Sequence, residues 1–352
     1  MNSLDDTINP VTIEPPDFST GVVAAVVAEK FNLFGEYTRL VSERDQNFRL
    51  RTSAGQGFVV KVTGLLEDRI STDFQIAVLS HFEESGFNYA PRVFRTVSGE
   101  KRCLITSDAG EDYCLRIVTW LDGSLLKDVE LTTSNAKRFG QRLAELDLSL
   151  ENFHFEGDGQ AGLWDMQDAF QLSCLLPHVD SEKVRNHARA VLTRFDESVI
   201  TALRALPGQA IHNDANPENI LIDPDGYISG FIDFGDALKA PRIIDVATAA
   251  SYLRTGGNNP LKFIEAFVDG YHQRSPLSDA EFHLLFDLVR TRLAMTLIIL
   301  YWRLTARDED DPYRQKTLEN ERNAFEFLVF LSDLGNHAFN RCINKVCRKP
   351  LQ

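Results

Sequence analysis

The sequence predicts an α+β protein of two lobes, a smaller one built on an antiparallel sheet and a larger one that is mostly helical. Three observations support this. The 352 residues exceed the usual size of a single domain. Hydrophobic residues make up 43% of the chain and charged residues 25%, which leaves ample material for a core. Strand-like runs dominate before residue 122, whereas helical periodicity dominates after it.

The N-lobe is expected over residues 18–121. Residues 1–17 hold three prolines among acidic residues and few large apolar groups, so we expect a flexible tail. A helix follows, with Ser19 or Thr20 as its N-cap, because Val22, Val23, Val26, Val27 and Phe31 recur at helical spacing. Turn signals then separate predicted strands at 47–52, 58–63, 92–97, 101–106 and 115–120, with one helix at 73–84.

The C-lobe is expected over residues 122–352. Ala136, Phe139, Leu143, Leu146 and Leu150 mark an amphipathic helix at its start. Further helical patterns cover 183–205, 242–254, 260–274, 278–305 and 313–335. Short strand-like runs lie between them at 209–212, 220–222 and 228–232. Nucleotides often bind where two such lobes meet.

The composition excludes several classes of protein. A net charge of −14 disfavours binding to nucleic acids and anionic membranes, and mildly favours cationic small molecules. The five cysteines are scattered, which argues against a zinc site or a disulfide framework. The N-terminus is acidic where a signal peptide would be basic, and the longest apolar stretch, 294–302, is too short to span a bilayer. We therefore expect a cytoplasmic protein, and the oligomeric state stays open.

The residues that carry chemistry lie in two runs, IHNDANPENILI at 211–222 and GFIDFGD at 230–236. Phosphoryl transfer from a nucleoside triphosphate needs a carboxylate for the attacking hydroxyl and oxygen ligands for Mg²⁺. Asp214 is the predicted base, and Asn219 and Asp233 are the predicted metal ligands, because they have the required order and spacing. A pair of polar turns would use the same residue types, but it does not require all three at these positions.

Other residues are predicted to support this chemistry. His212 precedes the base by two positions and is expected to orient the loop. Lys61, on an otherwise apolar strand, is the candidate that grips the nucleotide phosphates, and Asp73 or Gln75 of the following helix is its expected partner. The polar loop at 42–48 could lend N–H groups to phosphates, and Asn47 is our nucleotide-binding candidate there.

The acceptor is expected to be a small molecule. Asp236 is followed almost at once by a helical pattern at 243–247, which leaves little room for the platform on which a protein kinase binds a peptide. If the acceptor carries an ammonium group, carboxylates or aromatic faces should bind it. Our candidates for that role are Asp236, Asp165 and Trp164.

These motifs resemble the aminoglycoside phosphotransferase and choline kinase superfamily, and within it the hydroxylysine kinase-like phosphotransferases. The resemblance spreads over roughly residues 20–335 and rests on 45–48, 143–147 with Phe153, Trp164-Asp165, 211–222, 232–236 and 245–247. It implies a bilobal protein-kinase-like fold, Mg²⁺, and ATP or GTP as donor. It also implies that Asp214 is the base, that Asn219 and Asp233 are the metal ligands, and that Lys61 binds phosphates.

Two departures from the superfamily pattern stand out. Asn213 replaces a glycine that many relatives carry, and Asn tolerates the same left-handed backbone. Asp73 or Gln75 stands where relatives have an unambiguous helix Glu. The expected function is a kinase for an amino alcohol or hydroxy amino acid, with hydroxylysine first. Homoserine, aminoglycoside and choline-type acceptors stay open, as do a non-catalytic nucleotide-binding switch and, less favoured, a protein kinase.

Overall fold

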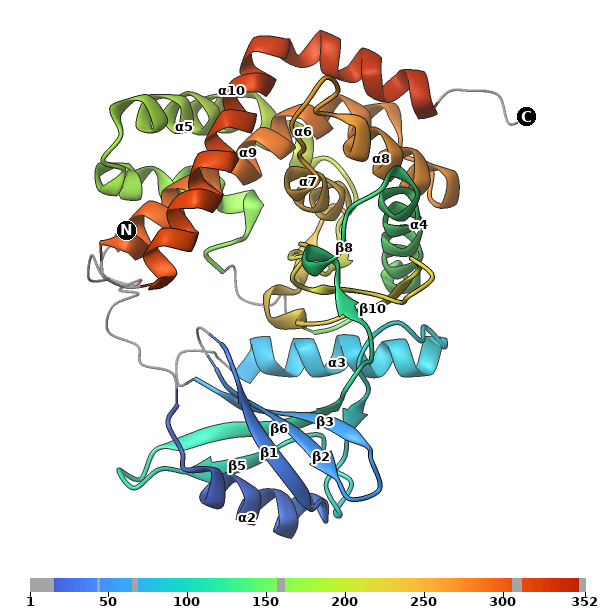
Figure 1. The fold of residues 1–352 in the computed structure, drawn as a ribbon, viewed down its shortest axis with the longest axis vertical. Helices are drawn as coiled ribbons and strands as arrows, with labels where there is room; N and C mark the ends of the chain where they lie inside the picture. Colours follow the sequence, from blue (N-terminus) through green and yellow to red (C-terminus); the bar gives the residue numbers. More distant parts are fainter. Residues whose placement is uncertain (1–15, 43–44, 65–68, 157–161, 306–311, 348–352) are drawn as a thin grey trace.

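The structure is a computed structural model that describes residues 16–42, 45–64, 69–156, 162–305 and 312–347. An antiparallel sheet forms the N-terminal part and helices form most of the rest, so the predicted α+β class is confirmed (Figure 1). Nearly all of the predicted tail, together with Glu43 and Arg44 of the predicted phosphate loop, lies outside the described residues.

The N-terminal sheet has six strands in the order β1-β2-β3-β6-β4, with β5 paired to β6, and every pairing is antiparallel. Its strands are β1 Gly35–Leu40, β2 Gln46–Thr52, β3 Gly57–Thr63, β4 Val93–Phe94, β5 Cys103–Thr106 and β6 Asp112–Thr119. Helix α2, Thr20–Phe31, begins at the predicted N-cap Ser19, whose side chain accepts a hydrogen bond from the Val22 N–H. Its buried face joins the sheet's own apolar core.

Helix α3, Arg69–Ser85, lies between the sheet and the helical part of the chain (Figure 1). Phe74, Val78 and Phe82 recur every four residues along it, and they are buried with the core of the C-terminal helices rather than with the core of the sheet. The helix therefore connects the two parts of the molecule, at the level where the predicted site residues meet.

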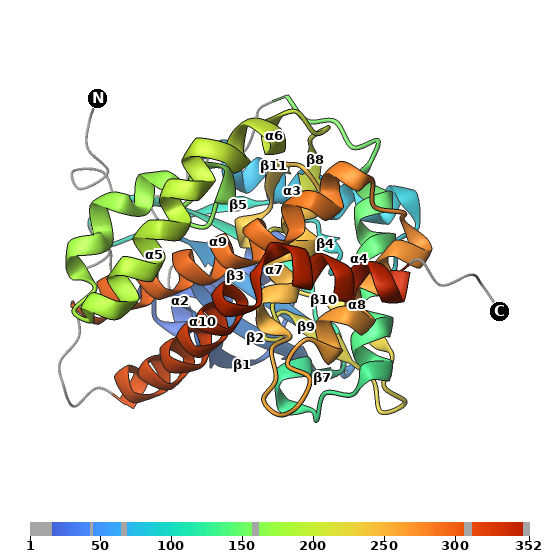
Figure 2. The same cartoon turned by 90° about the horizontal axis from the view of Figure 1, so that it is seen from above.

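The C-terminal part packs its helices around α9, Asp279–Leu304, whose residues from Phe282 to Ile299 are almost all buried. A helix that is apolar on all sides belongs in a core, and Figure 2 shows α9 passing beneath α10 and beside α7. The other helices are α4 Thr133–Leu150, α5 Glu182–Arg194, α6 Ile200–Arg204, α7 Ile243–Tyr252, α8 Lys262–Arg274 and α10 Pro312–Cys347, with the 3-10 segment η2 at Met166–His178.

Two small sheets carry the predicted chemistry. Strands β7 (Ser124–Leu125), β9 (Ile220–Ile222) and β10 (Ile228–Phe231) form one, and β8 (Gln209–Ile211) with β11 (Leu238–Ala240) forms the other. The strand-like runs expected at 209–212, 220–222 and 228–232 are confirmed. Among the helices that the structure describes, none combines the length and apolarity needed to cross a membrane.

Candidate active site

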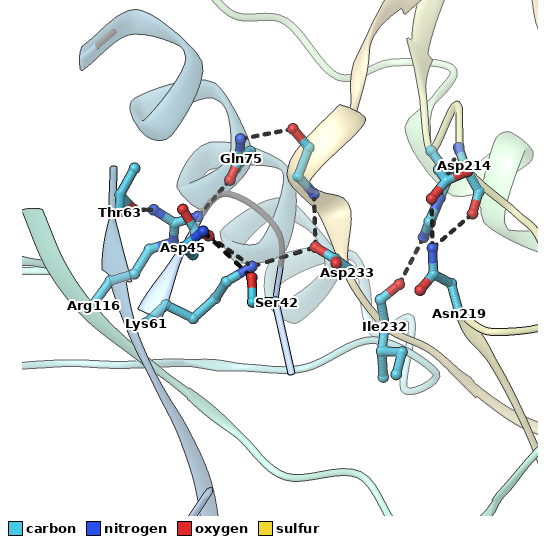
Figure 3. Close-up of polar contacts among 12 residues, drawn as sticks. Ser42, Asp45, Lys61, Thr63, Gln75, Arg116, Asp214, Asn219, Ile232 and Asp233 are labelled. Carbon is cyan, nitrogen blue, oxygen red and sulfur yellow. Dashed lines mark hydrogen bonds and ion pairs between the residues drawn. The ribbon is translucent and has the colours of Figure 1, made fainter. Parts of the chain in front are cut away.

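The loop between β8 and β9 and the turn after β10 bring Asp214, Asn219 and Asp233 into one region (Figure 3). The Asn219 side-chain amide donates to Asp214 Oδ2 at 2.7 Å and to the Asp214 carbonyl at 3.0 Å. The Ile232 N–H donates to the Asn219 carbonyl at 2.9 Å, which ties the strand end before Asp233 to the loop. Asp233 has a left-handed backbone with φ 58°, and its Oδ1 accepts from the Gly235 N–H at 3.3 Å.

His212 holds this loop from inside the protein. Its Nδ1 accepts from the Asp214 N–H at 3.2 Å, so Nε2 carries the proton and donates to the Ile232 carbonyl at 3.1 Å. Burial lowers the pKa of the imidazole, which favours this neutral form. The side chain is fully buried, so it joins the base loop to the Asp233 turn without touching a ligand. This geometry supports the orienting role predicted for His212.

Asp245, on α7, anchors the same loop from below. Its two carboxylate oxygens accept from the backbone N–H groups of His212 at 2.8 Å and Asn213 at 2.6 Å. Asn213 adopts φ 63°, the left-handed conformation expected for this position. Sequence reasoning cited Asp245 only as part of a motif and did not foresee this contact. The available signal was an acid inside the apolar helical run IIDVATAA, because buried carboxylates need partners.

Arg292 is a partner of Asp214 that sequence reasoning missed. Its Nη2 lies 2.9 Å from Asp214 Oδ1, and the arginine is only 1% exposed. Burial raises the pKa of Asp214 to about 7, against the opposing effect of the Arg292 charge and with a further upward contribution from Asp236. The sequence signal was an arginine within the apolar stretch of α9, since charged side chains are almost never fully buried unless paired.

The side chains of Asn219 and Asp233 fit a magnesium ion. The Asn219 amide nitrogen is committed to Asp214, which leaves its side-chain oxygen free of that contact. The Asp233 side chain is 55% exposed, so its carboxylate is accessible. Mg²⁺ takes hard oxygen ligands and usually keeps waters and substrate phosphates in its shell, so two protein ligands are enough. When bound there, the ion would neutralise charge on the β- and γ-phosphates.

Lys61 reaches from the N-terminal sheet toward Asp233. Its ammonium lies 3.3 Å from Asp233 Oδ1 and 3.6 Å from Asp45 Oδ2, and the lysine side chain is 12% exposed (Figure 3). Asn47 stands directly opposite Lys61 in the pairing of β2 with β3. The Asn47 Oδ1 is buried without a hydrogen-bond partner among the described residues. The nucleotide candidates Lys61 and Asn47 are therefore neighbours.

Asp73 does not face Lys61, contrary to expectation, because both of its carboxylate oxygens pair with Arg102 at 2.8 and 3.2 Å. Gln75 accepts from Arg116 Nη2 at 2.6 Å and donates to the Gly235 carbonyl at 3.1 Å. It thereby links α3 to the turn that follows Asp233. Besides Asp233, the acid that contacts Lys61 is Asp45, which comes from the segment before β2 rather than from the helix.

Replacing Asp45 by Asn is expected to lower turnover about tenfold, equivalent to about 1.4 kcal/mol. Without Asp45, the lysine keeps Asp233 as its carboxylate contact and competes there with the metal. Steady-state kinetics with varied nucleotide measure the effect. The matched control is Asp73→Asn, which removes an acid that is bound to Arg102 and should stay within about twofold of wild type. Equal losses in both variants would contradict the assignment of Asp45.

Two of the predicted ammonium-binding residues, Trp164 and Asp165, contact other residues of the chain. The Trp164 ring packs against the guanidinium groups of Arg292 and Arg303, 4.4 and 5.8 Å from the ring centroid. The Asp165 carboxylate is buried and accepts from the Gln167 N–H at 2.9 Å, where it caps η2. Of the three candidates, Asp236 lies near enough to raise the pKa of Asp214. The role of Trp164, Asp165 and Asp236 in binding an ammonium group stays a prediction.

The fold and this site define a small-molecule phosphotransferase that has an alcohol group as acceptor. Residues 36–282 match the model of the phosphotransferase enzyme family, and the chain belongs to that family. Hydroxylysine kinase of Mus musculus is 25% identical over 348 residues, which cover 92% of this chain and 92% of that protein. The resemblance inferred from the sequence motifs is thus confirmed.

Solved structures with the same fold include two small-molecule kinases. Amicoumacin kinase hAmiN, in complex with AMP-PNP, Ca2+ and Ami, superposes with a TM-score of 0.71 at 15% identity, covering 92% of this chain and 97% of that one. A microcompartment-associated aminopropanol kinase superposes with a TM-score of 0.63 at 15% identity, covering 90% and 98%. At this identity the likeness shows the fold, which agrees with the kinase-like architecture implied by the motifs.

Proposed function

We propose that this protein transfers the γ-phosphoryl group of Mg-ATP or Mg-GTP to the hydroxyl of a hydroxy amino acid or amino alcohol, with hydroxylysine as the first candidate. The observation that carries the proposal is the juxtaposition of Asp214, Asn219 and Asp233, with Lys61 reaching Asp233 from the other side. The similarity to mouse hydroxylysine kinase over nearly the whole chain supports the choice of acceptor.

Each residue has a distinct role in this proposal. Asp214 accepts a hydrogen bond from the acceptor hydroxyl and takes its proton as the oxygen attacks the γ-phosphorus. Asn219 and Asp233 hold Mg²⁺, and Lys61 binds the phosphates. Asn47 supplies a further contact to the nucleotide. His212 keeps the loop in place. Most of the rate enhancement then comes from positioning and electrostatics, because phosphoryl transfer asks little covalent chemistry of a protein.

In the same proposal, the two lobes have different functions. Strand β6 ends at Thr119 and β7 begins at Ser124, which supports a boundary near residue 122. Residues 18–121 would bind the nucleotide, and residues 122–352 would provide the catalytic loop and the acceptor site. The cytoplasmic location and the absence of a nucleic-acid or membrane partner stay predictions from composition.

Nucleotide should stabilise the protein much more with Mg²⁺ than with EDTA, because Asn219 and Asp233 bind the nucleotide through the metal. Saturation at about 100 times the dissociation constant adds about 2.7 kcal/mol to the free energy of unfolding. Thermal unfolding with ATP and with GTP, each with and without Mg²⁺, measures the effect and compares the two donors. Equal protection with and without the metal would overturn the proposed role of Asn219 and Asp233.

A further inference from the structure

Three arginines lie against two aromatic rings, and one of the three, Arg292, contacts the proposed base. Arg292 and Arg303, both on α9, flank the ring of Trp164. The Arg254 guanidinium, just beyond the end of α7, lies 5.8 Å from the ring centroid of Tyr252. Tyr252 also interacts with Arg292, which in turn holds Asp214. These contacts connect the arginines to the proposed base through Arg292.

Arg292 and Arg254 differ in their partners within the described residues. Arg292 is paired with Asp214, yet its Nε is buried without a hydrogen-bond partner among the residues that the structure describes. Arg254 donates to the Ser251 carbonyl at 2.8 Å, and no carboxylate in the part of the chain that the structure describes pairs with it. Burial accordingly lowers the pKa of Arg254.

An unpaired, partly buried guanidinium is costly, and a ligand carboxylate would relieve that cost. The planar fork of an arginine matches a carboxylate through two parallel hydrogen bonds. An aromatic face open to solvent would instead suit an ammonium group. Here the ring of Trp164 already faces the chain's own guanidinium groups, so this side of the site suits an anion.

We propose that the acceptor carries a carboxylate, which Arg254 binds, so that the enzyme selects hydroxy amino acids over amino alcohols. This inference rests on the proposed kinase function and narrows its substrate class. Hydroxylysine and homoserine both satisfy this requirement, whereas choline and 3-aminopropan-1-ol do not.

The test compares acceptor pairs that differ only in the carboxylate, 5-hydroxy-L-lysine with 1,5-diaminopentan-2-ol and L-homoserine with 3-aminopropan-1-ol. The full-length wild type should prefer the acid of a pair by about 10–100-fold in kcat/KM, the worth of hydrogen bonds to a charged group. Arg254→Met should lose most of that preference through a higher KM for the acid. Its kcat/KM for the decarboxylated partner should change by less than about twofold. Arg254→Lys should retain part of the preference.

Two controls separate binding from folding. Arg189→Met removes an exposed arginine on α5 and should leave the preference unchanged. The melting temperature of Arg254→Met should equal or exceed that of wild type, because the arginine has no acidic partner in the described protein to lose. A lower melting temperature with equal losses on both acceptors would make Arg254 structural and overturn the inference.

The two proposals fail in different ways. If wild type phosphorylates the decarboxylated compound as well as the acid, the kinase stands and the carboxylate site is wrong. If Mg-nucleotide binds and none of the four compounds is phosphorylated, the proposed function fails, and the carboxylate inference falls with it.

Discussion

Replacing Asp214 by Asn is expected to lower the rate of phosphorylation by about 10²–10⁴-fold, the usual contribution of general-base assistance. Asn is nearly isosteric with Asp, and its single side-chain oxygen can accept from either Asn219 or Arg292, but it cannot take the acceptor's proton. In the proposed mechanism Asp214 acts on the acceptor and not on the nucleotide, so the affinity for Mg-nucleotide should stay nearly unchanged. Measurements of turnover and of nucleotide affinity on the same preparation test both the expected loss of rate and the expected unchanged affinity.

The control for this variant is Asp225→Asn, which neutralises an exposed acid in the turn between β9 and β10. It should turn over like wild type. Because Arg292 is buried against Asp214, the melting temperature of Asp214→Asn should also be measured, and the assay run well below it. A folded Asp214→Asn protein with wild-type turnover would refute the base assignment.

Replacing Asp233 by Asn is expected to weaken Mg-nucleotide binding and turnover together, turnover by about 10²-fold or more. A carboxylate ligand to the metal stabilises transition-state charge by several kcal/mol, and each 1.36 kcal/mol is a factor of ten in rate. Lys61 also loses one of the two acids it contacts. Raising the Mg²⁺ concentration should restore part of the lost affinity, because the neutral amide oxygen remains a weak ligand.

Asp236→Asn is the matched control, since it removes a neighbouring charge from the same turn. It should leave the affinity for Mg-nucleotide close to wild type, whereas Asp233→Asn should not. If the two variants weaken nucleotide binding equally, the loss of one negative charge from the turn explains the effect, and Asp233 is not the metal ligand.

The strands and helices that the sequence predicted are those with a clear apolar period. Strand β3 alternates buried and half-buried residues, and its predicted bounds differ from the observed ones by one residue. Strand β1 was not predicted, because its residues GEYTRL lie at the sheet edge and are mostly exposed, so they show no apolar alternation. Helix α10 runs beyond the predicted end at 335, past a break where Gly335 has φ 76°.

The site was predictable where its residues are close in sequence. Asp214 and Asn219 belong to one loop, and their spacing alone indicates a shared task. Arg292 lies 78 residues from Asp214, and Asp245 lies 33 residues from His212. Such pairs depend on helix packing, which no local pattern reveals. What the sequence did offer was Arg292 beside the apolar stretch of α9 and Asp245 in the apolar helix α7.

Asp73 was wrongly expected to be a partner of Lys61, because the expectation came from the resemblance and not from a local pattern. A helix acid was expected from the resemblance, and Asp73 was the available acid. Position 75 is a glutamine that Arg116 engages, and the lysine instead meets Asp45 across the end of the sheet. The sequence marked Asp45 only as part of a motif, with nothing to indicate which charge it would face.

The central claim is tested most directly by following phosphate transfer to 5-hydroxy-L-lysine, using ³¹P NMR and mass spectrometry, with Mg-ATP and Mg-GTP each as donor. Wild type should yield a phosphate ester of the hydroxyl together with an equal amount of nucleoside diphosphate. Asp214→Asn should bind the same nucleotide and form the ester about 10²–10⁴ times more slowly. Mg-nucleotide binding without any phosphorylated product, for this compound and for homoserine, aminoglycoside and choline-type acceptors alike, would contradict the account and favour a nucleotide-binding switch.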